Sequence, residues 1–223
     1  MTDTPRIRVT IAAPPDQVWD ALRDRDRIRH WHGWEFDGGP DGSLDQEIET
    51  IYFTDVEVGD GALVLNGGDR VDVEEVDGGT RVTLTRAEPS GDPEWDAYYD
   101  DITEGWTTFL HQLRFAVERH PKGTRHTVVL RGLLADDPST ALDAFPDGSA
   151  SRTVWFRSAH QTGLAVDAWG PGLAIISHDP ATRATMVLLS LYDLAPDRVE
   201  NIRAQWSAWW HERLADDRQS KEP

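Results

Sequence analysis

Two histidines and a carboxylate lie close together near residue 30. His30 and His32 flank Trp31, and Glu35 follows shortly after them. Imidazole nitrogens and carboxylate oxygens can bind zinc. Residues two apart on a helix point about 200° apart, so the histidines converge only where the chain is extended or looped. We therefore expect histidines at the surface or at the rim of a pocket, with no metal and no cofactor.

The motifs of the common enzyme classes are absent. The sequence contains no nucleophile elbow, Walker loop, dinucleotide-binding fingerprint or HExxH pair. It also contains no cysteine, which excludes disulfides, thiolate metal sites and cysteine nucleophiles. The sequence by itself therefore indicates no catalytic residue.

Aromatic side chains are the second group that could bind a ligand. The chain has ten tryptophans among 223 residues. Flat rings bind apolar molecules, and phenol hydroxyls and indole N–H groups orient them. If a cavity remains between the elements that carry these rings, we expect it to be lined by Trp31, Trp34, Phe53, Tyr98, Tyr99, Ile102, Trp106 and Phe109. Without a cavity, the same side chains fill the core.

A long helix is predicted to carry five of these eight residues. From residue 95 to 120 apolar residues recur every three or four positions, which indicates an amphipathic helix with a wide aromatic stripe. Asp92 and Pro93 are typical of a helix start, and Pro121 ends the pattern. Gly105 lies mid-helix, where glycine costs about 1 kcal/mol relative to alanine, so we expect a strand or loop to approach closely there.

Shorter elements precede this helix. A strand is predicted at 6–11, a helix at 16–25, and a second short helix or a turn at 26–34. Strands are predicted at 47–53, 55–58, 62–65, 70–76 and 80–86. The later strands alternate apolar with polar residues and are separated by glycine-rich turns. This order predicts an α+β domain over residues 1–121, with a curved antiparallel sheet wrapped around the long helix.

The second half repeats parts of the first. Residues 15–22 are echoed at 138–145, 80–84 at 182–186, and 106–111 at 206–211, in the same order. Strands are predicted at 126–131, 151–157, 161–168, 172–177 and 183–192, and a last helix at 196–214. We expect residues 122–223 to form a shortened copy that lacks the second helix. An exposed sheet edge there leaves open a homodimer or packing on the first domain.

Four segments of the first half resemble the START-like, or SRPBCC, superfamily, and within it the family of the activator of Hsp90 ATPase. They are residues 7–22, 26–34, 78–88 and 98–113. The resemblance implies a helix-grip fold, in which a curved antiparallel sheet wraps around a long C-terminal helix with a cavity between them. It covers most of residues 6–119, and it is specific for fold rather than for function.

Charge and hydropathy limit the partners. The formal net charge of −18 argues against binding to nucleic acid or to an anionic membrane surface. The first ten residues lack the apolar core of a signal peptide, and no apolar run approaches the roughly 20 residues of a membrane span. We expect an acidic, cytoplasmic protein.

Three functions are compatible with the resemblance. The leading hypothesis is a non-enzymatic protein that binds a small apolar or aromatic molecule between the sheet and the long helix. The second is a chaperone-interaction module of the Hsp90 type, which requires an exposed apolar patch. The third is an enzyme of the polyketide cyclase or aromatase type, with Tyr98, Tyr99, His30 or His32 as acid–base groups.

Overall fold

The chain divides into two compact units, Met1–Gly123 and Thr124–Pro223. The structure is a computed structural model, and it describes residues 5–34, 43–89, 99–120, 122–135, 145–146 and 152–215. Each unit combines one five-stranded antiparallel sheet with helices, so the fold is α+β. The division follows Gly123, close to the predicted boundary after residue 121.

The first unit contains one sheet and four described helices. The strands are β1 (Arg6–Ile11), β2 (Glu57–Gly59), β3 (Ala62–Val64), β4 (Arg70–Val76) and β5 (Gly79–Thr85). The helices are α1 (Pro15–Arg23), α2 (Arg25–Arg29), α3 (Leu44–Tyr52) and α5 (Tyr99–Arg119). The strand order is β1-β5-β4-β3-β2. The predicted strands at 6–11, 62–65, 70–76 and 80–86 match these strands to within one residue.

The predicted strand at 47–53 is wrong, because this segment forms helix α3. Ser43 and Gln46 form a capping box at its start, in which each side chain bonds to the backbone of the other residue. Ile48 and Tyr52 are spaced by four and are both buried, with 2% and 0% of their surface exposed. The segment is rich in β-branched and aromatic residues, which favours a strand locally, but the cap and the buried helical face decide the outcome.

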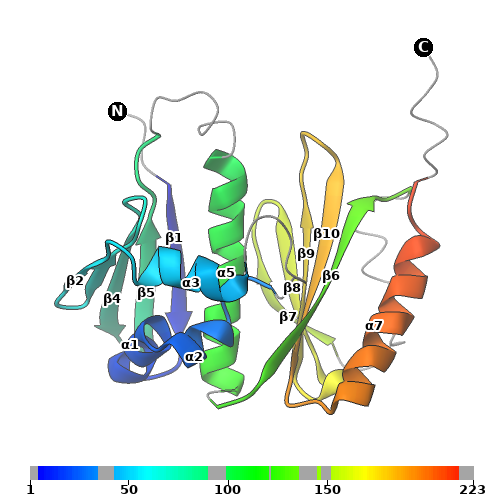
Figure 1. The fold of residues 1–223 in the computed structure, drawn as a ribbon, viewed down its shortest axis with the longest axis horizontal. Helices are drawn as coiled ribbons and strands as arrows, with labels where there is room; N and C mark the ends of the chain where they lie inside the picture. The colour runs from blue at the N-terminus through cyan, green and yellow to red at the C-terminus, as the bar shows by residue number, and fades with distance from the viewer. Residues whose placement is uncertain are drawn as a thin grey trace. The chain divides into compact units, whose positions relative to one another are not determined.

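The long helix α5 runs beside the edge strand β1 (Figure 1). Two hydrogen bonds join it to the sheet near its two ends. The Ala12 N–H, just after β1, donates to Glu118 Oε1 at 2.9 Å. At the other end Arg86 Nη1 donates to Thr103 Oγ1 at 3.0 Å. The helix predicted for 95–120 is confirmed over residues 99–119, and its predicted start lies outside the described residues.

The second unit has a sheet of the same strand order. Its strands are β6 (Arg125–Leu133), β7 (Arg152–Arg157), β8 (Gln161–Val166), β9 (Gly172–His178) and β10 (Ala184–Tyr192), arranged as β6-β10-β9-β8-β7. In both sheets the first strand pairs with the last, and the remaining strands follow in reverse. A short 3-10 helix, η1 (Asp167–Trp169), joins β8 to β9, and α7 (Pro196–His211) follows β10.

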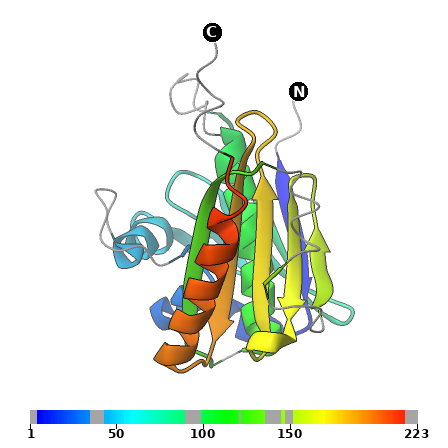
Figure 2. The same ribbon diagram turned by 90° about the vertical axis from the view of Figure 1, so that its right-hand side faces the viewer.

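Helix α7 lies against one face of the second sheet (Figure 2). Trp210 Nε1 donates to the Arg131 carbonyl of β6 at 3.3 Å, and Arg203 Nη2 donates to the Thr127 carbonyl at 3.3 Å. The enclosed core is apolar and contains side chains from α7, η1 and the sheet, among them Trp206 and Trp169. The predicted repeat of residues 106–111 at 206–211 falls on α5 and α7, whereas the predicted repeat at 138–145 lies outside the described residues except for Phe145.

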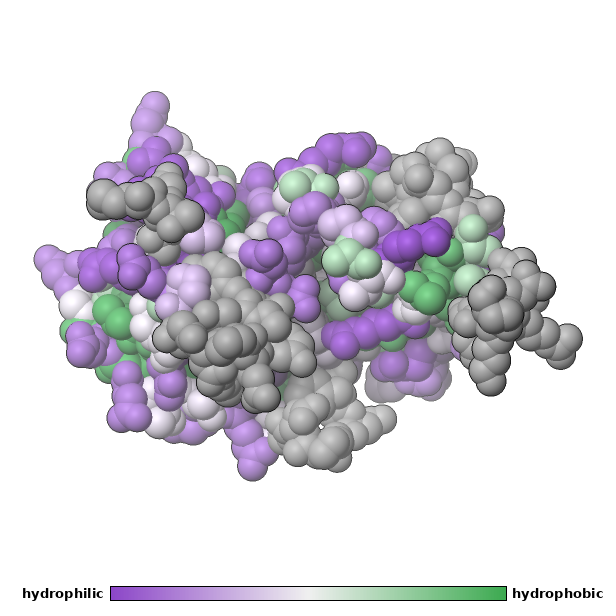
Figure 3. Space-filling view, turned by 90° about the horizontal axis from the view of Figure 1, so that it is seen from above, coloured by the Kyte–Doolittle hydropathy of each residue, from purple (hydrophilic) through white to green (hydrophobic). Residues whose placement is uncertain are grey.

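The visible surface is mainly polar. Figure 3 shows hydrophilic side chains over most of the described part of one face, with smaller apolar areas between them. Within the ranges that the structure describes, no helix is long and apolar enough to cross a membrane.

Candidate functional site

A cluster of aromatic rings lies between α5 and the segment from α2 to α3. We call it the aromatic cluster, and its members are Trp31, His32, Trp34, Tyr52, Trp106 and Phe109. Phe109 is central, because its ring centroid lies 4.4 Å from that of His32, 5.9 Å from that of Trp106 and 6.0 Å from that of Trp34. Tilted and edge-to-face pairs at such distances are favourable for aromatic rings.

Trp31 is held in the cluster by hydrogen bonds as well as by burial. Its indole Nε1 donates to the Ala21 carbonyl of α1 at 2.8 Å. Its own carbonyl accepts from Gln112 Nε2 of α5 at 2.9 Å. The Trp31 side chain is 1% exposed, and Gln112 is 0% exposed. Trp31 therefore joins α1, α2 and α5 around the cluster.

His32 is buried, which contradicts the expectation of a histidine at the surface or at a pocket rim. Its Nε2 lies 3.2 Å from Glu47 Oε1, and its Nδ1 lies 2.9 Å from the Tyr52 hydroxyl. A carboxylate only accepts, so Nε2–H donates to Glu47, and in the neutral ring Nδ1 accepts from the Tyr52 hydroxyl. Both ring nitrogens of His32 thus have partners within the protein.

The candidate zinc ligands can be compared with the structure only in part. Among the residues that the structure describes, no cluster of three histidine or acidic side chains could hold a metal ion. Glu35, the carboxylate of the predicted set, lies outside the described residues.

The pKa of Tyr52 gives a testable pH dependence. Burial raises the pKa of this phenol well above its ordinary value of 10.0, and the Glu47 carboxylate adds to the rise. Between the unfolded and the folded pKa, only the unfolded chain loses the proton. The free energy of unfolding therefore falls as pH rises above about 10, by up to about 1.4 kcal/mol per pH unit.

Replacing this residue, Tyr52→Phe, is expected to remove that alkaline loss. At neutral pH the variant should be less stable by about 0.5–1.5 kcal/mol, because the hydrogen bond to His32 is lost. The two stability curves should then approach each other as pH rises, in urea unfolding followed from about pH 8 to 11. If the free energies of unfolding of the two proteins instead keep a constant difference from about pH 8 to 11, the folded state does not raise the pKa of Tyr52.

The predicted ligand-binding residues divide into four groups, one of which is Ile102 alone, an exposed residue on α5. Trp31, Trp34, Trp106 and Phe109 come together in the aromatic cluster. Phe53 does not join them, because its ring packs outside the cluster under two guanidinium groups, with the Cζ of Arg25 4.0 Å and that of Arg23 5.3 Å from the ring centroid. Tyr98 and the side chain of Tyr99 lie outside the described residues.

Tyr52 was missed as a cluster member in the sequence. It lies in the segment that was predicted as a strand, and positions 44, 48 and 52 share one face of a strand as well as of a helix, so their spacing does not separate the two. The capping box of Ser43 and Gln46 is the signal that could have indicated the helix.

One side of the cluster is partly open. Ile102 is 40% exposed, and Trp34 and Phe109 are only partly buried. Gly105 lies between Ile102 and Phe109 on the same face of α5, and no described atom lies within 4 Å of the place where a Cβ would stand. The close approach expected at Gly105 is therefore not made by any described strand or loop. Gly105 itself is half-buried, and among the described atoms the space beside it is open, one helical turn before the ring of Phe109.

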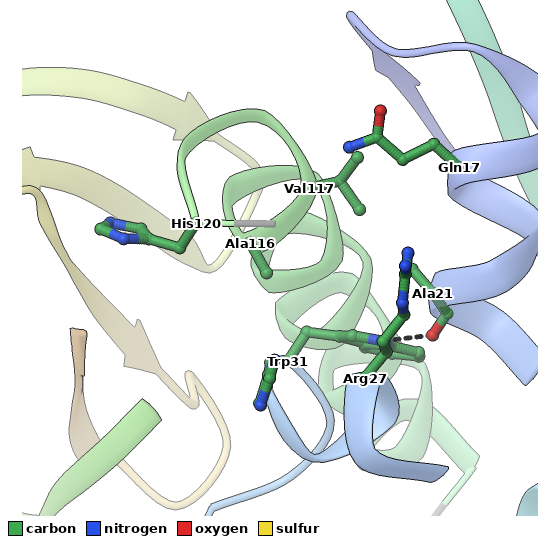
Figure 4. Close-up of a pocket in the computed structure, with 8 residues that line it drawn as sticks. Gln17, Ala21, Arg27, Trp31, Ala116, Val117 and His120 are labelled. Atoms are coloured by element: carbon green, nitrogen blue, oxygen red, sulfur yellow. Dashed lines mark hydrogen bonds between the residues drawn. The ribbon is translucent and has the colours of Figure 1, made fainter. Parts of the chain in front are cut away.

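A small pocket lies on the opposite side of Trp31. It has a volume of about 20 Å³, and it is lined by Gln17, Ala21, Arg27, His30, Trp31, Ala116, Val117 and His120 (Figure 4). Figure 4 shows the indole of Trp31 bonded to Ala21 and the His120 ring turned away from it. A space of this size holds about one water molecule. This pocket is too small for an organic ligand.

Comparison with known proteins gives no family for the chain. No family model matches it, and no curated protein matches it. Solved structures similar to it include the solution structure of an AHSA1-like protein from Rhizobium etli, at 23% identity with a TM-score of 0.34, covering 52% of this chain and 81% of that one.

Two further similar structures are di-domain proteins. The di-domain ARO/CYC BexL from the BE-7585A biosynthetic pathway is 12% identical with a TM-score of 0.39, covering 95% of this chain and 98% of that one. The di-domain ARO/CYC StfQ from the steffimycin biosynthetic pathway is 15% identical with a TM-score of 0.37, covering 92% and 91%. Because these TM-scores are below 0.5, the fold of this chain is described from its own strands and helices.

Proposed function

We propose that the first unit binds a small apolar or aromatic molecule on the partly open side of the aromatic cluster. The observation that carries this proposal is the space at Gly105, where no described atom lies within 4 Å of the place of a Cβ, one helical turn before the partly buried ring of Phe109. An apolar surface with rings held in fixed orientations is typical of small-molecule sites. A glycine at this position leaves room for a flat molecule against the helix.

The rings around this surface are positioned by the residues behind them. Phe109 packs on His32, and His32 is fixed by Glu47 and Tyr52. Both ring nitrogens of His32 and the hydroxyl of Tyr52 have partners inside the protein. A binding role therefore accounts for the arrangement without an acid–base step.

We also infer that the chain is a START-like protein with a helix-grip first domain and a duplicated second copy. The sequence resemblance over residues 6–119 supports the first part. The shared strand order of the two sheets, each followed by a long helix, supports the second. Of the remaining predicted ligand-binding residues, Ile102 would extend the site along the first turn of α5, and Tyr98 and Tyr99 stay predictions.

The test is a thermal-shift screen of the full chain with fatty acids, sterols, flavonoids and aromatic polyketides, followed by tryptophan fluorescence. A ligand at 100 times its dissociation constant should stabilise the protein by about 2.7 kcal/mol. A saturable shift with quenching or enhancement of tryptophan emission is the expected result. No shift from any class of compound would contradict the proposal.

Substitution of Gly105 separates binding from folding. Gly105→Ala should raise the free energy of unfolding by up to about 1 kcal/mol, because alanine favours the helix and meets no described atom. Gly105→Leu should fold as well as the wild type but fill the open space, and so weaken the ligand shift by at least about tenfold in affinity, or about 1.4 kcal/mol.

A matched control is Ala204→Leu, at an exposed position of α7. This variant should leave the ligand-induced shift unchanged. If Gly105→Leu folds and binds like the wild type, the ligand does not lie at this part of α5.

A further inference from the structure

The loop between β3 and β4 places an asparagine directly before a glycine in an exposed turn. The Gly68 N–H donates to the Leu65 carbonyl at 2.9 Å, so Asn66 and Gly67 are the two central residues of a β-turn. Gly67 has a φ of +92°, whereas the φ of Asn66 is not positive, and this combination defines a type II turn. The residues from Asn66 to Gly68 are exposed.

Two atoms of this turn can react with each other. They are the side-chain amide carbon of Asn66 and the backbone nitrogen of Gly67. The peptide between the central residues takes no part in the bond that closes a β-turn, and within the described ranges neither the Gly67 N–H nor the Asn66 amide has a hydrogen-bond partner. A Cβ on Gly67 would meet no described atom within 4 Å, so the space beside the nitrogen is open among the described residues.

This arrangement favours the loss of ammonia from Asn66. The Gly67 nitrogen gives its proton to hydroxide or to a buffer base and attacks Cγ of Asn66. The bond from Cγ to Nδ2 breaks, and ammonia leaves with a proton from the solvent, which produces a five-membered succinimide ring. Water then opens the ring at one of its two carbonyl carbons. Opening at Cγ gives aspartate, and opening at the main-chain carbonyl carbon gives isoaspartate, whose main chain runs through the former side chain.

The other asparagine of the chain lacks these features. The sequence contains two asparagines, Asn66 and Asn201. Asn201 lies within α7, where the following N–H, that of Ile202, donates to the carbonyl four residues earlier. Ile202 is β-branched and 2% exposed, so its nitrogen is both hydrogen-bonded and shielded. Asn201 is therefore an internal control in the same molecule.

Isoaspartate at position 66 would change a loop on which a buried ion pair depends. It adds one atom to the main chain inside this loop, which is closed by the Leu65 N–H donating to the Asp69 carbonyl at 2.8 Å. The Asp69 carboxylate accepts from Arg86 Nε and from the Ala87 N–H. A longer loop therefore displaces this carboxylate from its two donors.

We propose that Asn66 is a site of spontaneous covalent modification, where water converts the asparagine to isoaspartate and aspartate, and that isoaspartate weakens the contact of Asp69 with Arg86. Asparagine is one of the thermolabile residue types. The modification would also weaken the connection from the sheet to α5, since Arg86 donates to Thr103 as well. It needs no enzyme, and it does not rest on the ligand site proposed at Gly105.

The first test is mass spectrometry of the full chain after incubation in warm, mildly alkaline buffer and proteolysis. The peptide with Asn66 should gain about 1 Da, because a hydroxyl group replaces an amino group, and the peptide with Asn201 should not. The rate at Asn66 should be at least about tenfold higher, a difference of about 1.4 kcal/mol in activation free energy. The chain unfolded in urea gives the rate without the fold. If Asn66 reacts in urea but not in the folded chain, or if both asparagines react equally, the proposal is wrong.

Two variants separate the longer main chain from the new charge. Asn66→Gln keeps an amide but would need a six-membered ring, so it should gain no mass and keep its stability during incubation. Asn66→Asp, measured without incubation, carries the charge on an unchanged main chain. The incubated wild type should unfold at a lower urea concentration than either variant. If Asn66→Asp unfolds at the same urea concentration as the incubated wild type, the effect assigned to isoaspartate is wrong.

The ion pair can be observed directly in the incubated chain labelled with nitrogen-15. The Ala87 amide and the Arg86 Nε–H should each give a second signal, whose intensity follows the isoaspartate fraction measured by electron-transfer fragmentation. The indole signal of Trp210, in the second unit, should stay single. Unchanged Ala87 and Arg86 signals in protein that contains isoaspartate would contradict the effect on the ion pair. Because Asn66→Gln leaves α5 unchanged, failure of this proposal and failure of the ligand site can be distinguished.

Discussion

Trp31→Ala is expected to lower the free energy of unfolding of the first unit by about 3–5 kcal/mol. The side chain is 1% exposed, and its ring packs edge-on against Tyr52 at 5.7 Å and against His32 at 5.7 Å. Alanine would leave a cavity, and it would also leave the Ala21 carbonyl without the indole donor. The loss includes both the burial of a large ring and one buried hydrogen bond.

The measurement is urea unfolding followed by far-ultraviolet circular dichroism, with the two units fitted as separate transitions. Phe53→Ala is the control, because Phe53 is only partly buried and packs outside the cluster. Its loss should be clearly smaller, on the order of 1 kcal/mol. Similar losses for the two variants would show that Trp31 does not hold the helices of the first unit together.

Asp69→Ala is expected to cost about 3–5 kcal/mol, because it breaks a buried ion pair from one side. Asp69 Oδ1 accepts from Arg86 Nε at 3.0 Å and from the Ala87 N–H at 2.8 Å. The side chains are 11% and 7% exposed for Asp69 and Arg86. Arg86 also donates a hydrogen bond to Thr103, so loss of the carboxylate would also weaken the contact between the sheet and the start of α5.

Asp72→Ala is the matched control for this prediction. Asp72 pairs with Arg70 at 2.7 Å, but their side chains are 41% and 51% exposed. Exposed pairs contribute about 0–1 kcal/mol, since water screens them. Thermal and urea unfolding of the two variants should therefore differ by at least about 2 kcal/mol. A small loss for Asp69→Ala would mean that Arg86 finds equivalent partners without this carboxylate.

Local pattern was sufficient for most of the helices and strands. The spacing of apolar residues identified α5 and α7, and glycine-rich turns between alternating segments identified strands β3, β4 and β5. Such features depend on neighbours within a few residues, so they can be read from a single sequence. The exception was the segment 47–53, where strand-like composition and a helical cap conflict, and burial of Ile48 and Tyr52 decides for the helix.

The predicted site was only partly determined in this way. Helical spacing correctly grouped Trp106 with Phe109, and the tryptophan-rich segment supplied Trp31 and Trp34. Phe53 was predicted to face the long helix, but it packs outside the aromatic cluster. Phe53 directly follows α3, and the direction of its ring depends on where that helix ends and on which side chains contact the ring. Arg23 and Arg25 are those side chains here.

The sequence by itself determined the α+β class and the position of the long helices. It also showed that the chain has many aromatic residues and lacks the motifs of the common enzyme classes. Only the tertiary structure decided that His32 is buried between Glu47 and Tyr52, and that no described atom lies within 4 Å of the place of a Cβ on Gly105. The physical reason is that hydrogen-bond partners and open space depend on residues far apart in the chain, and no local spacing specifies which of them meet.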